Sequence, residues 1–165
     1  KYHVRASIAA IMVQVMRERN DKEGEKMWNY VLNCLGKLEH DGMSDEEEGT
    51  EEIVTDGKVT RVQVRKVMQV TWRHPSFRGL FELVDKTRGV EAAIFSRQGR
   101  PPMTRIRVDE EPSRKRPPPK HLPVSFFKPE YLQDLSKYSY QIDELRMSKK
   151  EFPLYEVNNL QNPDE

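Results

Sequence analysis

The sequence lacks features that would place it at once in several large classes of protein. It has a single cysteine, Cys34, in 165 residues, so an internal disulfide framework is excluded. No apolar run approaches the roughly 18 residues that a membrane-spanning helix needs, so no membrane partner is expected. The chain begins at Lys1 rather than at methionine, which favours a fragment or a processed product.

Recognisable catalytic and metal-binding spacings are also missing. The four histidines stand in unrelated segments, and none has a ligand-type neighbour at a known spacing: His3, His40, His74 and His121. A calcium loop starting at Asp41 would need an oxygen ligand third and glycine sixth, where the chain has Met43 and Glu46. Cys34 lies in an apolar helical pattern, typical of a buried structural thiol. We therefore predict no catalytic residue, no metal and no cofactor.

Charge is abundant and unevenly distributed. Charged residues make up 33% and hydrophobic residues 36% of the chain, which predicts one domain with a modest core and long solvated connections. Residues 39–56 hold nine acids and no Lys or Arg, whereas residues 57–108 hold twelve Lys and Arg against three acids. The net charge of +1 therefore conceals a chain that is polarised along its length.

Two helices are predicted at the start of the chain. Four apolar residues at helical spacing indicate the buried face of the first helix: Val4, Ile8, Ile11 and Val15. A second apolar stripe follows Asn20 or Asp21, either of which can cap a helix: Met27, Trp28, Val31, Leu32, Leu35 and Leu38. The short polar turn between them predicts a helical hairpin.

A change to alternating periodicity predicts strands after the acidic run. Asp56-Gly57 is typical of a tight hairpin turn, and we expect a small antiparallel sheet over about residues 52–72, with help from residues 104–108. Pro75 begins a predicted covering helix over about residues 75–88. Helices, then strands, then helices favour an α+β fold over a doubly wound parallel sheet.

Prolines divide the second half of the chain. We expect an α+β core in residues 1–110, a Pro-rich basic linker in residues 111–124, a C-terminal helical segment in residues 125–152 packed on the core, and a frayed tail in residues 153–165. Pro129 stands at the predicted start of the C-terminal helix.

The acidic run predicts an exposed loop with one modification site. Six carboxylates fall within residues 45–52, and their repulsion favours an extended, mobile and hydrated loop over residues 43–52, within an acidic loop spanning residues 39–56. Ser44 is followed by three acids, the pattern that acidophilic kinases of the casein-kinase type read. The alternative is a solvated loop whose only role is solubility.

The basic segment, residues 58–107, is a candidate nucleic-acid surface because guanidinium groups bind phosphate. Its candidate residues are Arg61, Arg65, Arg73, Arg78, Arg105 and Arg107. In the alternative, the acidic run folds back on this surface and neutralises it within the domain. Three basic residues in the linker resemble a nuclear-import signal, which favours a nuclear over a cytoplasmic protein: Arg114, Lys115 and Arg116.

Three stretches in this order resemble a lineage-expanded protein family of mushroom-forming (basidiomycete) fungi: "LGKLEHDGMSDEEE", "VTWRHPSFRGLFELVDK" and "HLPVSFFKPEYLQDLS". The shared residues are Gly42, Met43 and Ser44, then Trp72, Arg73 and Pro75, then Leu122, Pro123, Phe126, Tyr131 and Leu132. The family pattern has a second serine before the first acid, which this chain lacks. The resemblance implies no activity, and the abundance of the family is compatible with an association with mobile elements.

These observations leave two hypotheses from different classes. The first is a non-enzymatic interaction module that binds nucleic acid or another anionic partner through the basic segment, modulated by the acidic loop. The second is a fragment of an enzyme, for example one associated with mobile elements, whose active site is not recognisable in this sequence. A pocket with converging carboxylates and a perturbed histidine would favour the enzyme.

Overall fold

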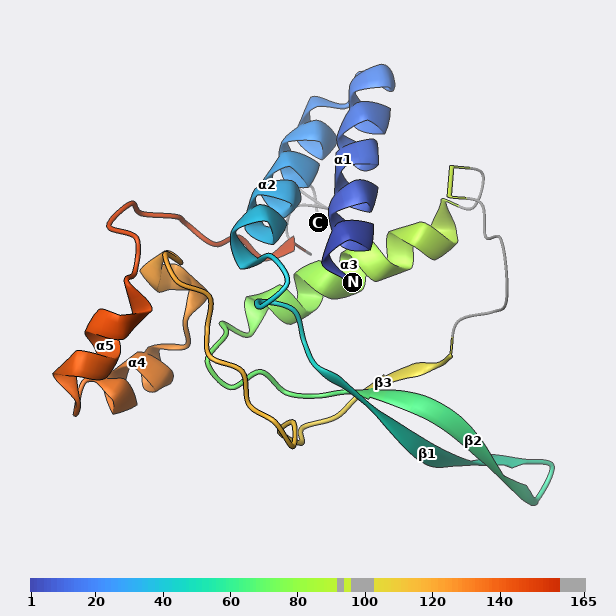
Figure 1. Cartoon of the computed structure of the whole chain (residues 1–165). Coiled ribbons are helices and arrows are strands. Elements are labelled where there is room, and N and C mark those ends of the chain that lie inside the picture. Colours follow the sequence, from blue (N-terminus) through green and yellow to red (C-terminus); the bar gives the residue numbers. More distant parts are fainter. Residues whose placement is uncertain (92–93, 96–102, 158–165) are drawn as a thin grey trace. The chain divides into compact units, whose positions relative to one another are not determined.

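Helices precede and follow a small sheet in this chain, which confirms the α+β prediction (Figure 1). The structure, a computed structural model, describes residues 1–91, 94–95 and 103–157. In chain order the elements are α1 (Tyr2–Glu18), α2 (Lys22–Leu38), β1 (Glu46–Thr55), β2 (Lys58–Val67), α3 (Ser76–Val90), β3 (Arg105–Arg107), the 3-10 helix η1 (Val124–Phe126), α4 (Pro129–Leu135) and α5 (Ser139–Leu145). None of the helices in the described residues is both long and apolar enough to cross a bilayer.

The chain divides into two compact units. We call residues 1–43, 72–97 and 117–165 the helical unit, and residues 44–71 and 98–116 the sheet unit. The helical unit carries all five α-helices that the structure describes, and the sheet unit carries the three strands. Most of the buried apolar side chains belong to the helical unit.

The predicted helical hairpin is confirmed, because α1 and α2 pack against each other. The Asp21 side chain caps α2 by accepting a hydrogen bond from the Gly24 backbone N–H at 2.9 Å. An ion pair between Arg17 and Glu25, 2.7 Å long, joins the two helices near this turn. The short connection therefore places the end of α2 beside the beginning of α1.

The predicted buried face of α1 is only partly correct: Ile8 is buried as predicted, but the inner face is rotated away from the rest of the predicted stripe. The buried residues are Arg5, Ile8, Ala9, Met12 and Val13, whereas the predicted Val4 and Ile11 are exposed. Apolar residues of α1 occur on nearly every side of the helix, so their spacing alone does not determine which side is buried. The inner face contains Arg5 because a carboxylate and an aromatic ring from α3 satisfy its guanidinium group, as described below.

The apolar stripe of α2 is confirmed in outline, with Cys34 in place of Leu32 among its buried members. Burial raises the pKa of the Cys34 thiol from 9.0 to about 12, an effect that a hydrogen bond with Tyr30 partly offsets. Burial likewise raises the pKa of the Tyr30 hydroxyl. Both groups therefore favour their neutral forms in the folded chain.

We expect the thiol of Cys34 to resist the thiol reagent DTNB in the folded chain at about pH 8 and to react fully in guanidinium chloride. The contribution of the neutral Cys34 thiol to the free energy of unfolding is complete below pH 9.0, the ordinary pKa of the thiol. It is lost as the pH rises toward the folded-state pKa of about 12, because the thiol ionises at a lower pH in the unfolded chain than in the folded chain. Chemical denaturation across this alkaline range should show the loss, and Cys34→Ala should reduce its slope. Rapid labelling of the folded chain would contradict the burial.

The covering helix predicted over residues 75–88 is confirmed as α3. Its buried face is formed by Phe77, Leu80, Phe81 and Val84. α3 packs against α1, and an Arg5–Asp85 hydrogen-bonded ion pair joins them, with Arg5 Nε and Nη2 lying 2.9 and 2.7 Å from the two carboxylate oxygens. The guanidinium group of Arg5 also lies 4.5 Å from the centre of the Phe81 ring.

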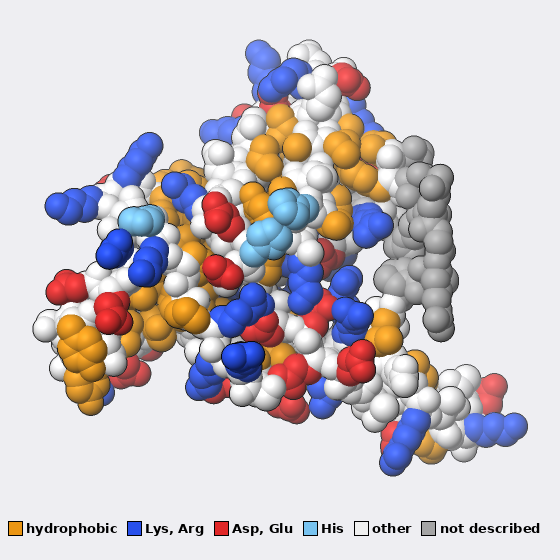
Figure 2. Space-filling model, in the orientation of Figure 1, with side chains coloured by type: hydrophobic (Ala, Val, Ile, Leu, Met, Phe, Trp, Pro, Cys, Tyr) orange, Lys and Arg blue, Asp and Glu red, His pale blue; other side chains and the backbone are white. Residues whose placement is uncertain are grey.

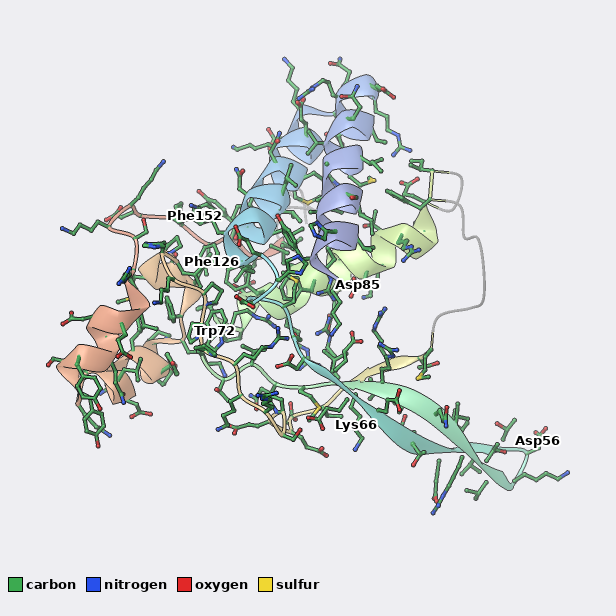
Figure 3. The ribbon with its side chains drawn as sticks, in the orientation of Figure 1. Asp56, Lys66, Trp72, Asp85, Phe126 and Phe152 are labelled. Carbon is green, nitrogen blue, oxygen red and sulfur yellow. The ribbon has the colours of Figure 1, made fainter. Side chains whose placement is uncertain are left out.

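Aromatic side chains hold the C-terminal segment within the helical unit. The Phe126 ring lies 4.7 Å from Phe77 and 5.2 Å from Phe152, measured between centroids, and Trp72 lies 5.6 Å from Phe127 (Figure 3). The backbone N–H of Lys128 donates to the carbonyl of Trp72 at 2.8 Å. Residues 111–122 contain no helix or strand, and residues 158–165 of the predicted tail lie outside the described part of the chain.

In the sheet unit, β1 and β2 form the predicted hairpin around Asp56-Gly57, whose φ angles of 51° and 74° are those of a type I′ turn (Figure 3). The hairpin begins at Glu46 and ends at Val67, earlier than the predicted range of residues 52–72. β3 pairs with the other edge of β2 but runs parallel to it, because the chain passes through α3 before it returns. The strand order is β1-β2-β3.

The prediction of a mobile acidic loop over residues 43–52 is wrong for most of its length. Residues 46–55 are strand β1, and Ser44 is only 4% exposed. The register places Glu47 opposite Lys66 and Glu48 opposite Arg65. Positive charges on β2 therefore offset the repulsion within the acidic run, and the run forms a paired strand in which Glu48 and residues 50–55 are still exposed.

Candidate nucleic-acid interface

The sheet places four of the six candidate arginines on one face. Side chains alternate along a strand, so Arg61 and Arg65 of β2 point to the same side. Arg105 of β3 is the register partner of Arg65, and Arg107 is the partner of Val67, which puts both on that side as well. We call Arg61, Arg65, Arg105 and Arg107 the arginine face.

The acidic strand β1 contributes carboxylates to the same face. Glu46 lies between two arginines, with Oε1 3.0 Å from Arg105 Nε and Oε2 3.5 Å from Arg65 Nη1. Its side chain is only 6% exposed, while those of the two arginines are 47% exposed. Glu52 pairs with Arg61 at 3.1 Å. Three carboxylates, those of Glu46, Glu48 and Glu52, thus share this face of the sheet with four guanidinium groups.

The opposite face of β1 connects to the linker. Glu47 accepts hydrogen bonds from the hydroxyl and the backbone N–H of Ser113, at 2.7 and 2.8 Å. These bonds hold the pKa of the Glu47 carboxyl below its usual range. Lys66, beside Glu47 in the sheet, pairs with Glu110 at 3.8 Å. Figure 2 shows Lys and Arg side chains interspersed with Asp and Glu side chains on the drawn face.

Arg73 and Arg78 belong to the helical unit and are not part of the arginine face. Arg73 is 7% exposed, its guanidinium group donates to the carbonyl of Gly42, and it lies 4.6 Å from the centre of the Phe81 ring. The expectation that Arg73 belongs to a surface is therefore corrected: it is a buried residue of the core. Arg78 is exposed on α3 and pairs with Glu82 at 3.3 Å.

The predicted phosphorylation site and the predicted nuclear-import cluster differ in their exposure to solvent. Ser44 is buried, so a kinase could reach its hydroxyl only after local opening. The import-type cluster is exposed and lies in a segment without helix or strand, where Lys115 pairs with Glu111 and Arg116 pairs with Asp45. Arg114 is exposed beside them.

The helical unit contains a cavity of about 640 Å³ between α1, α2 and α3. Methionines and Trp28 supply apolar walls, and the carboxylates are those of Asp21, Glu23, Glu82 and Glu91. Among the described residues that line it there is no histidine, cysteine or serine, and the hydroxyl of Thr87 donates to the carbonyl of Leu83. The combination of carboxylates with a perturbed histidine that would favour an enzyme is not found in this cavity.

Sequence reasoning missed one pair of residues that the fold brings together. His3 and His40 stand in segments that look unrelated in the sequence, yet their Nε2 atoms lie 3.1 Å apart in the helical unit. A helical hairpin with a short turn places its two ends side by side, so the predicted hairpin itself could have indicated this contact.

We compared the chain with known protein families, curated proteins and solved structures. No protein-family model, curated protein or solved structure matches this chain.

Proposed function

We propose that this chain is a non-enzymatic interaction module that binds the phosphate backbone of nucleic acid through the arginine face. The observation that supports the proposal is the common orientation of Arg61, Arg65 and Arg105 on one side of the sheet. Guanidinium groups donate hydrogen bonds in the fork geometry that phosphate oxygens accept. Arg61 and Arg65 stand four residues apart on an extended strand, about 13 Å along its axis, so one extended backbone would contact both.

The composition of this face predicts the kind of binding. Its β1 and β2 positions carry no aromatic side chain on which a base could stack. Phosphate contacts then dominate, and the affinity depends strongly on salt and weakly on sequence. The exposed cluster at residues 114–116 would add to this electrostatic attraction, and we propose a nuclear location from the same cluster.

Strand β1 would modulate this binding. Glu48 and Glu52 lie on the arginine face, opposite Arg65 and Arg61 in the register, and compete with phosphate for their guanidinium groups. Phosphorylation of Ser44, the residue two positions before β1, would add negative charge next to this strand, and it requires local opening because Ser44 is buried. The modulating element is thus a paired strand and not a free loop.

The test is the affinity for a fluorescent single-stranded oligonucleotide of mixed sequence, measured by anisotropy over a range of salt concentrations. We expect the triple variant Arg61→Gln, Arg65→Gln, Arg105→Gln to bind more weakly and to lower the slope of log K against log salt by about 2, since each lost contact to a single strand removes roughly 0.7. Arg78→Gln is the control, because it removes an exposed arginine from the helical unit.

The companion variant changes Glu48 and Glu52 to Gln, which keeps the size of both side chains. We expect it to bind more tightly than the unchanged chain, with an advantage that shrinks as salt rises. Glu46 is left intact because its nearly buried carboxylate joins β2 to β3 through Arg65 and Arg105. If the triple variant loses no more affinity than Arg78→Gln, the arginine face is not the binding surface.

A further inference from the structure

His3 and His40 form an exposed imidazole pair in the helical unit. Their Nε2 atoms are 3.1 Å apart, and their ring centroids lie 4.7 Å apart with an interplanar angle of 75°. Two neutral imidazoles at this distance share one proton, since one Nε2–H donates to the other Nε2 lone pair. Figure 2 shows histidine side chains in contact at the surface, where solvent reaches them.

The local structure holds both rings in place. His3 stands in the first turn of α1, and His40 follows the end of α2 by two residues. The turn after α2 is closed by hydrogen bonds from the Gly42 N–H to the Leu38 carbonyl, 2.8 Å, and from the Met43 N–H to the His40 carbonyl, 3.2 Å. Gly42 is required here, because a Cβ atom at this position would lie 2.5 Å from the Leu38 carbonyl oxygen.

Tyr2 packs against both imidazoles and restricts their rotation. Its ring lies 5.1 Å from His3 and 5.0 Å from His40, measured between centroids. The three rings therefore form one small cluster in which both Nε2 atoms point toward each other. The packing of α1 against α2 fixes the backbone positions on either side of the pair.

We propose that His3 and His40 bind a Zn²⁺ ion through their Nε2 atoms. Zn–N bonds are about 2.0–2.1 Å long, so two nitrogens at a tetrahedral angle lie about 3.4 Å apart, close to the 3.1 Å observed. On binding, the ring that donated its Nε2 proton carries a proton on Nδ1 instead, so both neutral imidazoles are Nδ1–H tautomers whose Nε2 lone pairs are available to the metal. Imidazole is a favourable ligand for Zn²⁺, which tolerates variable coordination because it has no geometric preference of its own.

Water completes the coordination in this proposal. No group of three or more His, Cys, Asp or Glu side chains that could hold a metal occurs among the described residues, so the protein supplies two ligands. A two-ligand site binds more weakly than a structural zinc site with four protein ligands and keeps positions open to solvent. The bound ion would join the start of α1 to the turn after α2 and stabilise the helical hairpin.

The experiment is a calorimetric titration of the full chain with ZnCl₂, with the N-terminus acetylated. Acetylation removes the amino group of Lys1, which would otherwise be an additional metal ligand two residues before His3. The variants are His3→Gln and His40→Gln, both at exposed positions. The matched control is His121→Asn, which removes an exposed histidine while tolerating its φ angle of 67°.

We expect binding of one Zn²⁺ per chain and a rise in melting temperature with added zinc, both unaffected by His121→Asn. His3→Gln and His40→Gln should each weaken zinc binding by more than roughly 10- to 100-fold, which is the usual cost of losing a residue that only supports a metal ligand. NMR signals of the His3 and His40 rings should shift on titration, while those of His74 stay in place. Absence of zinc binding by the unchanged chain, or equal affinity in either single variant, would overturn the proposal.

Discussion

Phe126→Ala is expected to lower the free energy of unfolding of the chain by about 3–5 kcal/mol, the range for truncating a fully buried aromatic ring. Phe126 is completely buried and contacts Phe77 of α3 and Phe152 near the end of the described chain. Alanine would leave a cavity between segments that are far apart in sequence. Urea denaturation, followed by circular dichroism, measures the change.

The control for this prediction is Val124→Ala in the same short helix η1. Val124 is 53% exposed, so we expect a change within about 0.5 kcal/mol. Phe126→Leu should lie between the two because it keeps most of the apolar volume. A small effect of Phe126→Ala, similar to that of Val124→Ala, would show that the C-terminal segment contributes little to the core.

The ion pair between Arg5 and Asp85 is expected to have the second large effect. Arg5→Met should lower the free energy of unfolding by roughly 1.5–3 kcal/mol, because hydrogen bonds to charged groups contribute about this much. Methionine retains an apolar chain of similar length, so the loss reports the two hydrogen bonds to Asp85 and the contact with the Phe81 ring. The side chain of Arg5 is 9% exposed, which limits screening by salt.

Arg17→Met supplies a matched control on the same helix. Arg17 also pairs with a carboxylate, Glu25, but its side chain is 59% exposed, and exposed pairs contribute about 0–1 kcal/mol. A double-mutant cycle of Arg5→Met with Asp85→Asn should give a coupling energy of about 1–3 kcal/mol that added salt barely changes. Independent, additive effects of the two substitutions would contradict the pairing.

The charge pairs between β1 and β2 follow from the position of a single turn in the sequence. Counting outward from Asp56-Gly57 pairs Glu52 with Arg61 and Glu48 with Arg65, the partners that the hairpin has. The prediction of a loop gave too much weight to repulsion within residues 45–52. The alternative, in which the acidic run neutralises the basic segment within the domain, agrees with the register of the hairpin. The position of a hairpin turn sets the register of the two strands that it joins. The turn at Asp56-Gly57 therefore determines the cross-strand partners of ten residues on each side.

The burial of arginines could not be predicted in this way. Arg5 and Arg73 look like surface residues in the sequence, yet their guanidinium groups lie 4.5 and 4.6 Å from the centre of the same Phe81 ring. A charged side chain is tolerated in a core only where partners satisfy it, and those partners come from distant parts of the chain, Asp85 for Arg5 and Gly42 for Arg73. Sequence patterns contain no information about such long-range partners.

The sequence by itself determined the elements of this protein: a helical pair, a hairpin around Asp56-Gly57, a covering helix after Pro75 and a proline-rich connection. These follow from periodicity, capping and turn chemistry, which act between near neighbours. Tertiary structure alone decided which face of α1 is buried, that Arg105 and Arg107 lie on the same side of the sheet as Arg61 and Arg65, and which arginines enter the core. Those outcomes depend on packing and on charge pairs between residues that are distant in the sequence, where local preference has no influence.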